Sequence, residues 1–303
     1  MHKNILITGG SGLVGTRLTQ MLLQKGYQVS HLSRAAGDEG LVKAFQWDVE
    51  NGIVDPKAFE NIHAIIHLAG AGIADRPWSE KRKREILESR THSTALLEKS
   101  LKDIPNKVEV FISASAIGYY GYAGSDHVFK EEDEPANDFL AYVVKQWEHT
   151  VDRISSLNIR VAKLRIGILL SEKGGALVEL ARPVRLFVGS PLGSGEQYVS
   201  WIHIDDVCAM FIHALENDLN GAYNAVAREP VTNKELTKAI AETLGRPLWL
   251  PHVPAFILKM VLGEMADLVI KGSKVSPAKI QLSGFQYRFP NLNDALRDLF
   301  EKK

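Results

Sequence analysis

Three glycines at a spacing of three residues, Gly9, Gly12 and Gly15, stand near the start of the chain. The apolar run 5–7 precedes them and apolar side chains repeat at helical spacing after them, so they join a strand to a helix. Glycine permits a tight turn, close approach of a phosphate and close packing of the helix on the strand. The free N–H groups of the new helix face that phosphate. We therefore predict a dinucleotide site formed by Gly9, Gly10, Ser11, Gly12, Leu13, Val14 and Gly15.

The end of the next predicted strand, residues 27–33, indicates which dinucleotide binds. In NAD-preferring sites an acidic residue at this point binds the ribose hydroxyls, whereas a nearby arginine accommodates the additional phosphate of NADP. Ser33 and Arg34 stand here, and no acidic residue precedes them in the strand. We predict NADP(H) as the cofactor, with an ordinary surface arginine as the alternative interpretation of Arg34.

Two further predicted strands, 42–47 and 64–68, also end in polar or small residues. The carboxyl ends of the strands in a doubly wound sheet face the ligand crevice. We expect Asp48 near the adenine end of the cofactor, although a turn-capping aspartate is an equally good interpretation. Near the middle of the cofactor we expect Leu68, Ala69 and Gly70.

Hydroxyl-bearing residues follow a fifth predicted strand, residues 108–112. Its carboxyl end is where a nicotinamide ring and a substrate would meet. We assign Ser113 to the cofactor site and consider Ser115, Tyr119 and Tyr120 as catalytic candidates. The alternative is that these side chains only cap turns and pack.

The length of 303 residues and the hydrophobic content of 45% allow a large buried core. We predict an α/β fold, a doubly wound Rossmann sheet that is mainly parallel, with a smaller C-terminal substrate-side domain. The cofactor-binding domain is expected at 1–165. The substrate-side region, 166–303, is expected to interleave with the core and to include a C-terminal module at about 247–295.

The composition argues against several classes of protein. Thirty-six basic and 36 acidic residues cancel, so no overall charge favours nucleic acid or an anionic membrane. The single cysteine, Cys208, cannot form an internal disulfide, and the first apolar run is too short for a signal peptide. The apolar run 255–262 falls far short of the ~20 residues that span a bilayer. We expect a soluble cytoplasmic protein without a metal site, because no Cys/His cluster is present.

Seven motifs occur in order along nearly the whole chain: TGGSGLVG, HLAGAGI, SASAIGYYG, DFLAYVVKQWE, GSGEQYVSWIHIDD, GAYNAVA and GFQYRFP. On these motifs the chain resembles an atypical, extended short-chain dehydrogenase/reductase of the NAD(P)-dependent, nucleotide-sugar-epimerase-like family with a small C-terminal domain of unknown function. The resemblance implies an oxidoreductase or epimerase of a small, nucleotide-sugar-like substrate. It also makes a homodimer plausible, paired through the helices expected at about 79–102 and 137–156.

The chain departs from the family pattern at the catalytic pair. Catalytic members carry a tyrosine and, four residues later, a lysine that lowers the tyrosine pKa for proton exchange with the substrate. Counting back from Glu148, which matches a later acidic residue of that helix, these positions fall on Leu140 and Val144. Tyr142 and Lys145 stand only three residues apart, and the resemblance argues against a shifted pair, since the related family generally lacks it.

The catalytic serine of the superfamily is best matched by Ser115, with Ser113 in contention. A proton would then have to come from Tyr119, Tyr120 or His203, although a histidine between isoleucines is more often a satisfied core residue. Two function classes remain. We favour an NADP-dependent oxidoreductase or epimerase over a non-catalytic protein that binds NADP(H) as a sensor or structural ligand.

Overall fold

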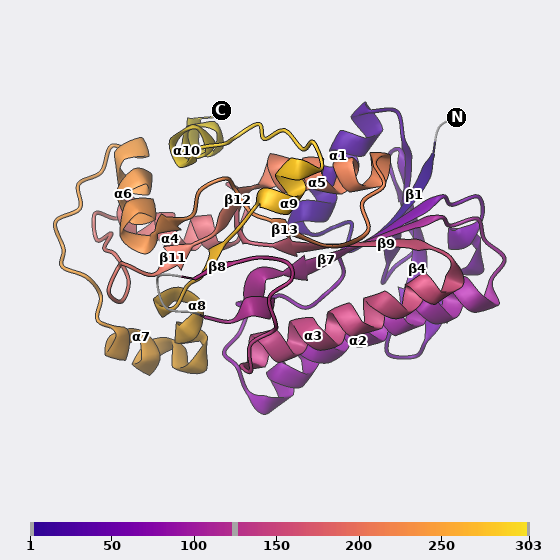
Figure 1. The fold of residues 1–303 in the computed structure, drawn as a ribbon, viewed down its shortest axis with the longest axis horizontal. Helices are drawn as coiled ribbons and strands as arrows, with labels where there is room; N and C mark the ends of the chain where they lie inside the picture. Colours follow the sequence, from indigo (N-terminus) through magenta and orange to yellow (C-terminus); the bar gives the residue numbers. More distant parts are fainter. Residues whose placement is uncertain (1–2, 123–126, 302–303) are drawn as a thin grey trace.

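A twisted central sheet lies between two layers of helices in the computed structural model, which describes residues 3–122 and 127–301 (Figure 1). The strands are parallel to their neighbours except for two short strands, which are both antiparallel to the strand that they pair with. The order across the sheet is β13 (Gly221–Ala225), β9 (Arg160–Ile166), β7 (Val110–Ala116), β6 (Ala64–His67), β1 (Asn4–Thr8), β2 (Gln28–Ser33), β4 (Val42–Asp48) and β3 (Gly37–Glu39). The short strand β5 (Ile53–Val54) also pairs with β4. The predicted doubly wound, mainly parallel fold is confirmed.

The direction in which the chain builds this sheet reverses at β1. From β1 the chain first adds β2 and β4 on one side, then crosses to β6 and continues outward through β7, β9 and β13. Ligands of open α/β sheets bind at such a reversal, beyond the carboxyl ends of the strands. The glycine-rich loop leaves β1 at this point, so the topology places it at the expected crevice.

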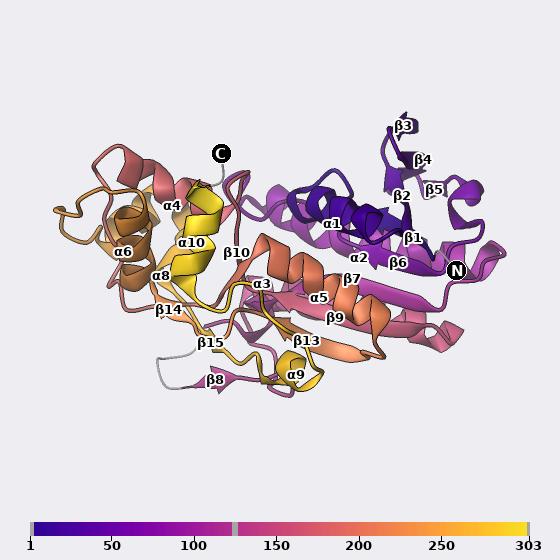
Figure 2. The ribbon, with the colours of Figure 1, turned by 90° about the horizontal axis from the view of Figure 1, so that it is seen from above.

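The long helices cover both faces of the sheet, as the view from above also shows (Figure 2). On one face lie α1 (Leu13–Gln24) and α5 (Ile204–Glu216), and on the other α2 (Glu80–Asp103) packs beside α3 (Phe139–Asp152). The buried residues of α1, Gly15, Leu18, Thr19 and Leu22, recur at helical spacing. The helix α1 therefore presents one face to the sheet.

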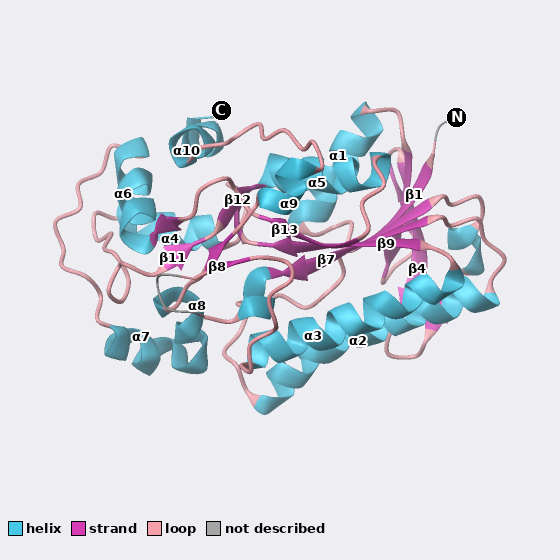
Figure 3. Ribbon diagram, in the orientation of Figure 1, coloured by secondary structure: helices cyan, strands magenta, loops and turns pink. Residues whose placement is uncertain are grey.

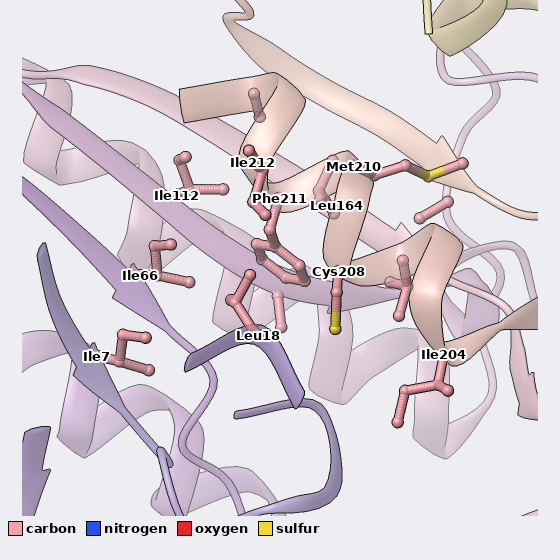
Figure 4. Packing of buried hydrophobic residues seen from close by; sticks show 14 of the residues in the cluster. Ile7, Leu18, Ile66, Ile112, Leu164, Ile204, Cys208, Met210, Phe211 and Ile212 are labelled. Atoms are coloured by element: carbon pink, nitrogen blue, oxygen red, sulfur yellow. The ribbon is translucent and has the colours of Figure 1, made fainter. Parts of the chain in front are cut away.

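The core under α5 is built from one isoleucine or leucine of each of four adjacent strands (Figure 4). These side chains are fully buried: Ile7, Ile66, Ile112 and Leu164. Phe211 and Cys208 of α5 lie above them, also without exposed surface. Burying a side chain of this size stabilises the fold by roughly 1.5–3 kcal/mol. Because Cys208 is the only cysteine and is buried, no disulfide contributes.

The chain after β9 forms smaller elements beside the sheet before and after β13 rejoins it (Figure 3). Within the described ranges, three two-stranded pairs occur: β10 (Ile168–Leu170) with β12 (Trp201–His203), β11 (Tyr198–Val199) with β14 (Val231–Thr232), and β15 (Lys274–Val275) with β8 (Val128–Phe129). The remaining helices are α4 (Ala176–Arg185), α6 (Asn233–Thr243), α7 (Ala255–Leu262), α8 (Asp267–Ile270), α9 (Ala278–Leu282) and α10 (Leu292–Glu301), with 3-10 turns η1 (Pro56–Phe59), η2 (Ile117–Tyr120), η3 (Arg153–Leu157) and η4 (Gly263–Ala266).

None of the helices in the described part of the chain combines the length and the apolar character needed to cross a membrane. Over the same residues, no group of three or more His, Cys, Asp or Glu side chains is arranged to hold a metal ion.

Candidate cofactor site

The glycine-rich loop lies between a strand and a helix, as predicted. β1 ends at Thr8, α1 begins at Leu13, and Gly12 is the N-cap residue, with no side chain capping the helix. The N–H groups of the first turn therefore remain available to an anion. A Cβ atom at Gly15 would collide with the backbone of Gly9 and Gly10, so only glycine lets the helix pack this closely.

A second turn, residues 68–70, is held against this loop by Thr8. The Thr8 hydroxyl accepts hydrogen bonds from the N–H groups of Leu68 and Ala69, both at 3.2 Å. Gly9, which has a φ of +70°, comes so close that a Cβ on it would lie 2.9 Å from the Ala69 nitrogen. The two turns thus form one continuous surface at the carboxyl ends of β1 and β6. Sequence reasoning assigned both turns to the cofactor, and the fold brings them together.

His67 determines the direction in which the Thr8 hydroxyl donates its hydrogen bond. Thr8 Oγ1 lies 2.7 Å from His67 Nδ1, and since it already accepts two N–H groups, it donates its own proton to that nitrogen. His67 Nε2 then donates to Thr94 Oγ1 at 3.1 Å. Complete burial, together with the positive charge of Arg90, lowers the pKa of His67 to about 3, so the ring is neutral. This chain ties the end of β1 to the middle of α2.

Arg34 lies directly beyond Ser33, the last residue of β2, with its side chain exposed. Among the side chains that the structure describes, no carboxylate forms an ion pair with Arg34. Its guanidinium is therefore accessible at the position where a ribose phosphate is expected.

Asp48 ends β4 and caps the following turn. Its carboxylate accepts from the backbone N–H of Asn51 at 3.1 Å and from the Asn51 side chain at 2.7 Å. These hydrogen bonds lower the pKa of the Asp48 carboxyl. The turn-capping alternative accounts for this residue in the structure, and contact with the adenine stays a prediction.

The catalytic candidates Ser115 and Tyr120 belong to one buried polar network. The register of the sheet sets Ser115 of β7 and Asn224 of β13 on either side of Arg165 in β9. Ser115 Oγ donates to Glu148 Oε1 at 2.5 Å, and Arg165 donates to both Glu148 oxygens at 2.8 and 2.9 Å. Arg165 also donates to the Tyr120 hydroxyl at 2.8 Å. That hydroxyl in turn donates its proton to Asn224 Oδ1 at 2.7 Å.

This network leaves few groups free for proton transfer. Tyr120 both donates and accepts, and burial raises its pKa to about 12. Burial alone would raise the pKa of Glu148, but Arg165 and then Lys163 outweigh it and the pKa is lowered. Tyr119 is only half-buried, and its ring stacks on the Arg165 guanidinium at 3.6 Å from the centroid. Of the three candidates, Tyr119 is the least buried.

Sequence reasoning used Glu148 only as a marker of α3 and did not consider Lys163 or Arg165. A signal was present: both basic residues stand two apart in a strand whose other residues are mostly apolar. Such alternation places two cations on one face of a buried strand, where they require partners. Those partners could not be named from the sequence.

The positions of the missing catalytic pair are occupied by packing residues. Leu140 and Val144 are 8% and 4% exposed, and both lie next to Gly118 of η2, 3.5 and 3.9 Å from where its Cβ would be. Tyr142 is 52% exposed and Lys145 is also exposed, so α3 presents them to solvent. A shifted tyrosine–lysine pair does not face the end of β7.

Ser113, the other serine of this strand end, is fully buried. Its hydroxyl donates to the carbonyl oxygen of Ala114 at 2.7 Å. Ser113 pairs with His67 of the neighbouring strand β6 and therefore lies near the 68–70 turn. Its contact with a cofactor stays a prediction.

His203 is the N-cap residue of α5. Its Nδ1 accepts from the Asp205 N–H at 3.0 Å, its Nε2 lies 3.4 Å from Asp298 Oδ2, and its ring packs on Phe289 at 3.9 Å between centroids. With 1% exposure it matches the core-histidine alternative. It also lies at the edge of a pocket of about 660 Å³ together with Ser11, Gly12, Leu13, Arg17, Lys173 and Gly175.

A profile of the NAD dependent epimerase/dehydratase family matches residues 5–225. The chain belongs to this family. A domain of unknown function (DUF1731) matches residues 253–299, which overlap the C-terminal module expected at about 247–295. The predicted family resemblance is thereby confirmed.

Named relatives cover almost the whole chain. The epimerase family protein YfhF of Bacillus subtilis is 36% identical over 98% of this chain and 97% of its own length. Human epimerase family protein SDR39U1 is 32% identical, over 97% of this chain and 99% of its own. These similarities extend through both halves of the molecule.

Solved structures show the same architecture. The human SDR39U1 protein, solved with NADPH, superposes with a TM-score of 0.89 at 32% identity, covering 99% of this chain and 100% of that chain. The nucleoside-diphosphate sugar epimerase from Corynebacterium glutamicum superposes with a TM-score of 0.80 at 31% identity, covering 99% of this chain and 58% of that chain. This chain therefore has the NAD(P)-binding fold of the epimerase-like short-chain dehydrogenases/reductases.

Proposed function

We propose that this protein binds NADP(H) on the Gly9–Gly15 loop and acts as an oxidoreductase or epimerase of a nucleotide-sugar-like small molecule. The exposed Arg34 at the end of β2, with no acidic residue in that strand, carries the preference for NADP over NAD. The human relative solved with NADPH supports the cofactor, and the Corynebacterium sugar epimerase supports the substrate class.

The geometry of the loop fits a dinucleotide. Space that a Cβ would fill at Gly9 and Gly15 is taken by backbone, and the first turn of α1 has no capping side chain. In the proposed complex these N–H groups bind the pyrophosphate and Arg34 binds the ribose phosphate. The 68–70 turn and Ser113 line the middle and nicotinamide side, with Asp48 at the adenine end. Residues 1–165 would thus hold the cofactor and 166–303 the substrate.

The bound dinucleotide would supply or accept the hydride. The protein would have to move a proton at the substrate hydroxyl or carbonyl oxygen, and Tyr119 is the least buried candidate at the end of β7. Burial raises the pKa of the Tyr119 phenol, and Arg165, stacked on its ring, offsets only part of this rise while it holds the ring in place. Leu140 and Val144 contribute an apolar wall rather than chemistry.

A non-catalytic NADP(H)-binding role is the second candidate. It is favoured by the apolar residues at the tyrosine and lysine positions and by the Ser115 proton, which is held by Glu148. A sensor or structural ligand site would need the Gly9–Gly15 loop but no proton donor.

Two measurements separate these functions. Calorimetric titration with NADPH and NADH tests the cofactor, and tighter NADH binding would contradict the proposal. Incubation of the protein with NADPH and a panel of carbonyl compounds and nucleotide sugars, followed by absorbance and isomer analysis, tests for turnover. Tight NADPH binding with no turnover across the panel would favour the non-catalytic role.

We also propose a cytoplasmic location and a homodimer paired through α2 and α3, which lie side by side on one face of the sheet (Figure 1). Multi-angle light scattering tests the dimer, since a mass near 33.6 kDa would show a monomer instead.

A further inference from the structure

Arg90 is a buried arginine whose side-chain N–H groups make few hydrogen bonds. It lies on the inner side of α2, is 8% exposed, and packs against Gly70, with its Cζ 3.2 Å from where a Gly70 Cβ would be. Its Nη1 donates to the Ile86 carbonyl oxygen at 2.9 Å. The structure gives its Nε and Nη2 no hydrogen-bond partner among the described residues, although a guanidinium offers five N–H donors.

The groups around Arg90 supply no negative charge. His67 is neutral and Arg82 is a second cation, itself paired with Glu85 at 2.7 Å. Burial, and secondarily Arg82, lower the pKa of Arg90 to about 10, which still leaves it charged at neutral pH. No described carboxylate forms an ion pair with it. Among the described residues Arg90 is thus a buried charge without a counter-ion, an arrangement that favours the binding of an anion.

An aromatic side chain of α3 completes this environment. The Arg90 guanidinium lies 5.3 Å from the centroid of the Trp147 ring. The buried Trp147 Nε1–H has no hydrogen-bond partner in the part of the chain that the structure describes. An indole N–H and a guanidinium are both donors only, so the pair has donors to offer and no acceptor of its own.

We infer that Arg90 receives an oxyanion, a phosphate or a carboxylate, of the ligand that binds over Gly70. The planar guanidinium fork matches such groups, and the absence of a side chain at Gly70 leaves the space directly beside the guanidinium open to them. Through Thr8 the 68–70 turn is joined to the glycine-rich loop, so the oxyanion belongs to the bound dinucleotide or to the substrate beside it. The choice between these sources rests on the proposed function.

Binding measurements on Arg90→Met test this inference. Arg84→Met is the matched control, because Arg84 is an exposed arginine of the same helix. The probes are NADPH, NADH, inorganic pyrophosphate and, on NADPH-loaded protein, UDP-glucuronate. Loss of a charged hydrogen bond is expected to weaken binding at least about tenfold. A parallel Arg90→Lys variant keeps the charge without the fork and covers the case in which Arg90→Met does not fold.

The pattern of losses identifies the source. Equal weakening of NADPH and NADH places the dinucleotide pyrophosphate at Arg90, since both carry it, whereas loss of UDP-glucuronate alone places a substrate oxyanion there. Pyrophosphate binding that depends on Arg90, in a protein that binds neither dinucleotide, would support the oxyanion site while refuting the proposed function. If Arg90→Met or Arg90→Lys folds and binds every probe as the Arg84→Met control does, the inference is wrong.

Discussion

Ser115 donates its hydroxyl proton to Glu148, with Oγ and Oε1 2.5 Å apart in the buried interior between β7 and α3. A hydroxyl bound in this way can polarise a substrate carbonyl only after it leaves the carboxylate. Glu148 is in turn held by two nitrogens of Arg165. The serine that matches a catalytic residue by sequence is therefore part of an internal ion-pair network, and this relationship shapes the predictions for both stability and activity.

Glu148→Gln is expected to destabilise the protein by about 3–5 kcal/mol, because it leaves Arg165 buried without its counter-charge. Urea denaturation gives the free energy of unfolding. Glu88→Gln, which alters an exposed acidic residue of α2, should change it by less than about 0.5 kcal/mol. The double variant Glu148→Gln/Arg165→Met should recover part of the loss, and equal stability of Glu148→Gln and wild type would contradict the prediction.

Any turnover found in the substrate panel should not depend on Tyr142 or Lys145, since both are exposed on α3. Loss of the true proton donor costs typically ~10²–10⁴ in rate. We expect Tyr119→Phe to show this loss, and kcat should also be measured for Ser115→Ala, Tyr120→Phe and His203→Ala. A collapse confined to Tyr142→Phe and Lys145→Ala would show that a shifted pair operates.

Arg34→Asp should weaken NADPH binding at least about tenfold and leave NADH binding unchanged or improved, because only the ribose phosphate of NADPH is expected to contact Arg34. Calorimetry with both dinucleotides measures the ratio. Arg84→Asp introduces the same charge change on an exposed surface of α2 and serves as the control. An unchanged ratio in Arg34→Asp would remove the basis for NADP specificity.

Gly15→Ala should abolish dinucleotide binding, because its Cβ would collide with the backbone of Gly9 and Gly10 and force the loop open. Gly37→Ala is the matched control, since no atom lies within 4 Å of where its Cβ would be. Calorimetry and thermal melting should separate the two variants. Normal binding by Gly15→Ala would mean that the helix does not approach the loop as closely as described.

The buried His67 makes stability fall in mild acid. Its pKa is about 3 in the folded protein against 6.5 for the free side chain, so between these values only the unfolded state binds the proton. The contribution of the neutral His67 to the free energy of unfolding is therefore fully present above pH ~6.5. It decreases as the pH falls, by about 1.4 kcal/mol per pH unit for one proton. Urea denaturation of His67→Gln between pH 4 and 7 should show a slope about one proton smaller than wild type. His92→Gln, at an exposed position of α2, should keep the wild-type slope.

Local sequence patterns determined the dinucleotide-binding fold. The change from an apolar run to glycines and then to helical periodicity depends on neighbouring residues only, so it identified β1, the loop and α1 without further information. The same holds for the absent tyrosine and lysine, because Leu140 and Val144 are chemically unable to replace them wherever the helix lies.

The tertiary structure alone decided what the polar side chains do. Ser115, Arg165 and Asn224 lie up to 109 positions apart and become neighbours only through the register of three parallel strands. A register shift of one residue would turn these side chains to the other face of the sheet. In the sequence, Arg90 is likewise one basic residue among several in a charged helix. Only the packing of α2 on the 68–70 turn and on Trp147 buries it, with no counter-ion among the described side chains. Partners that are distant in the chain are set by packing, which no local pattern encodes.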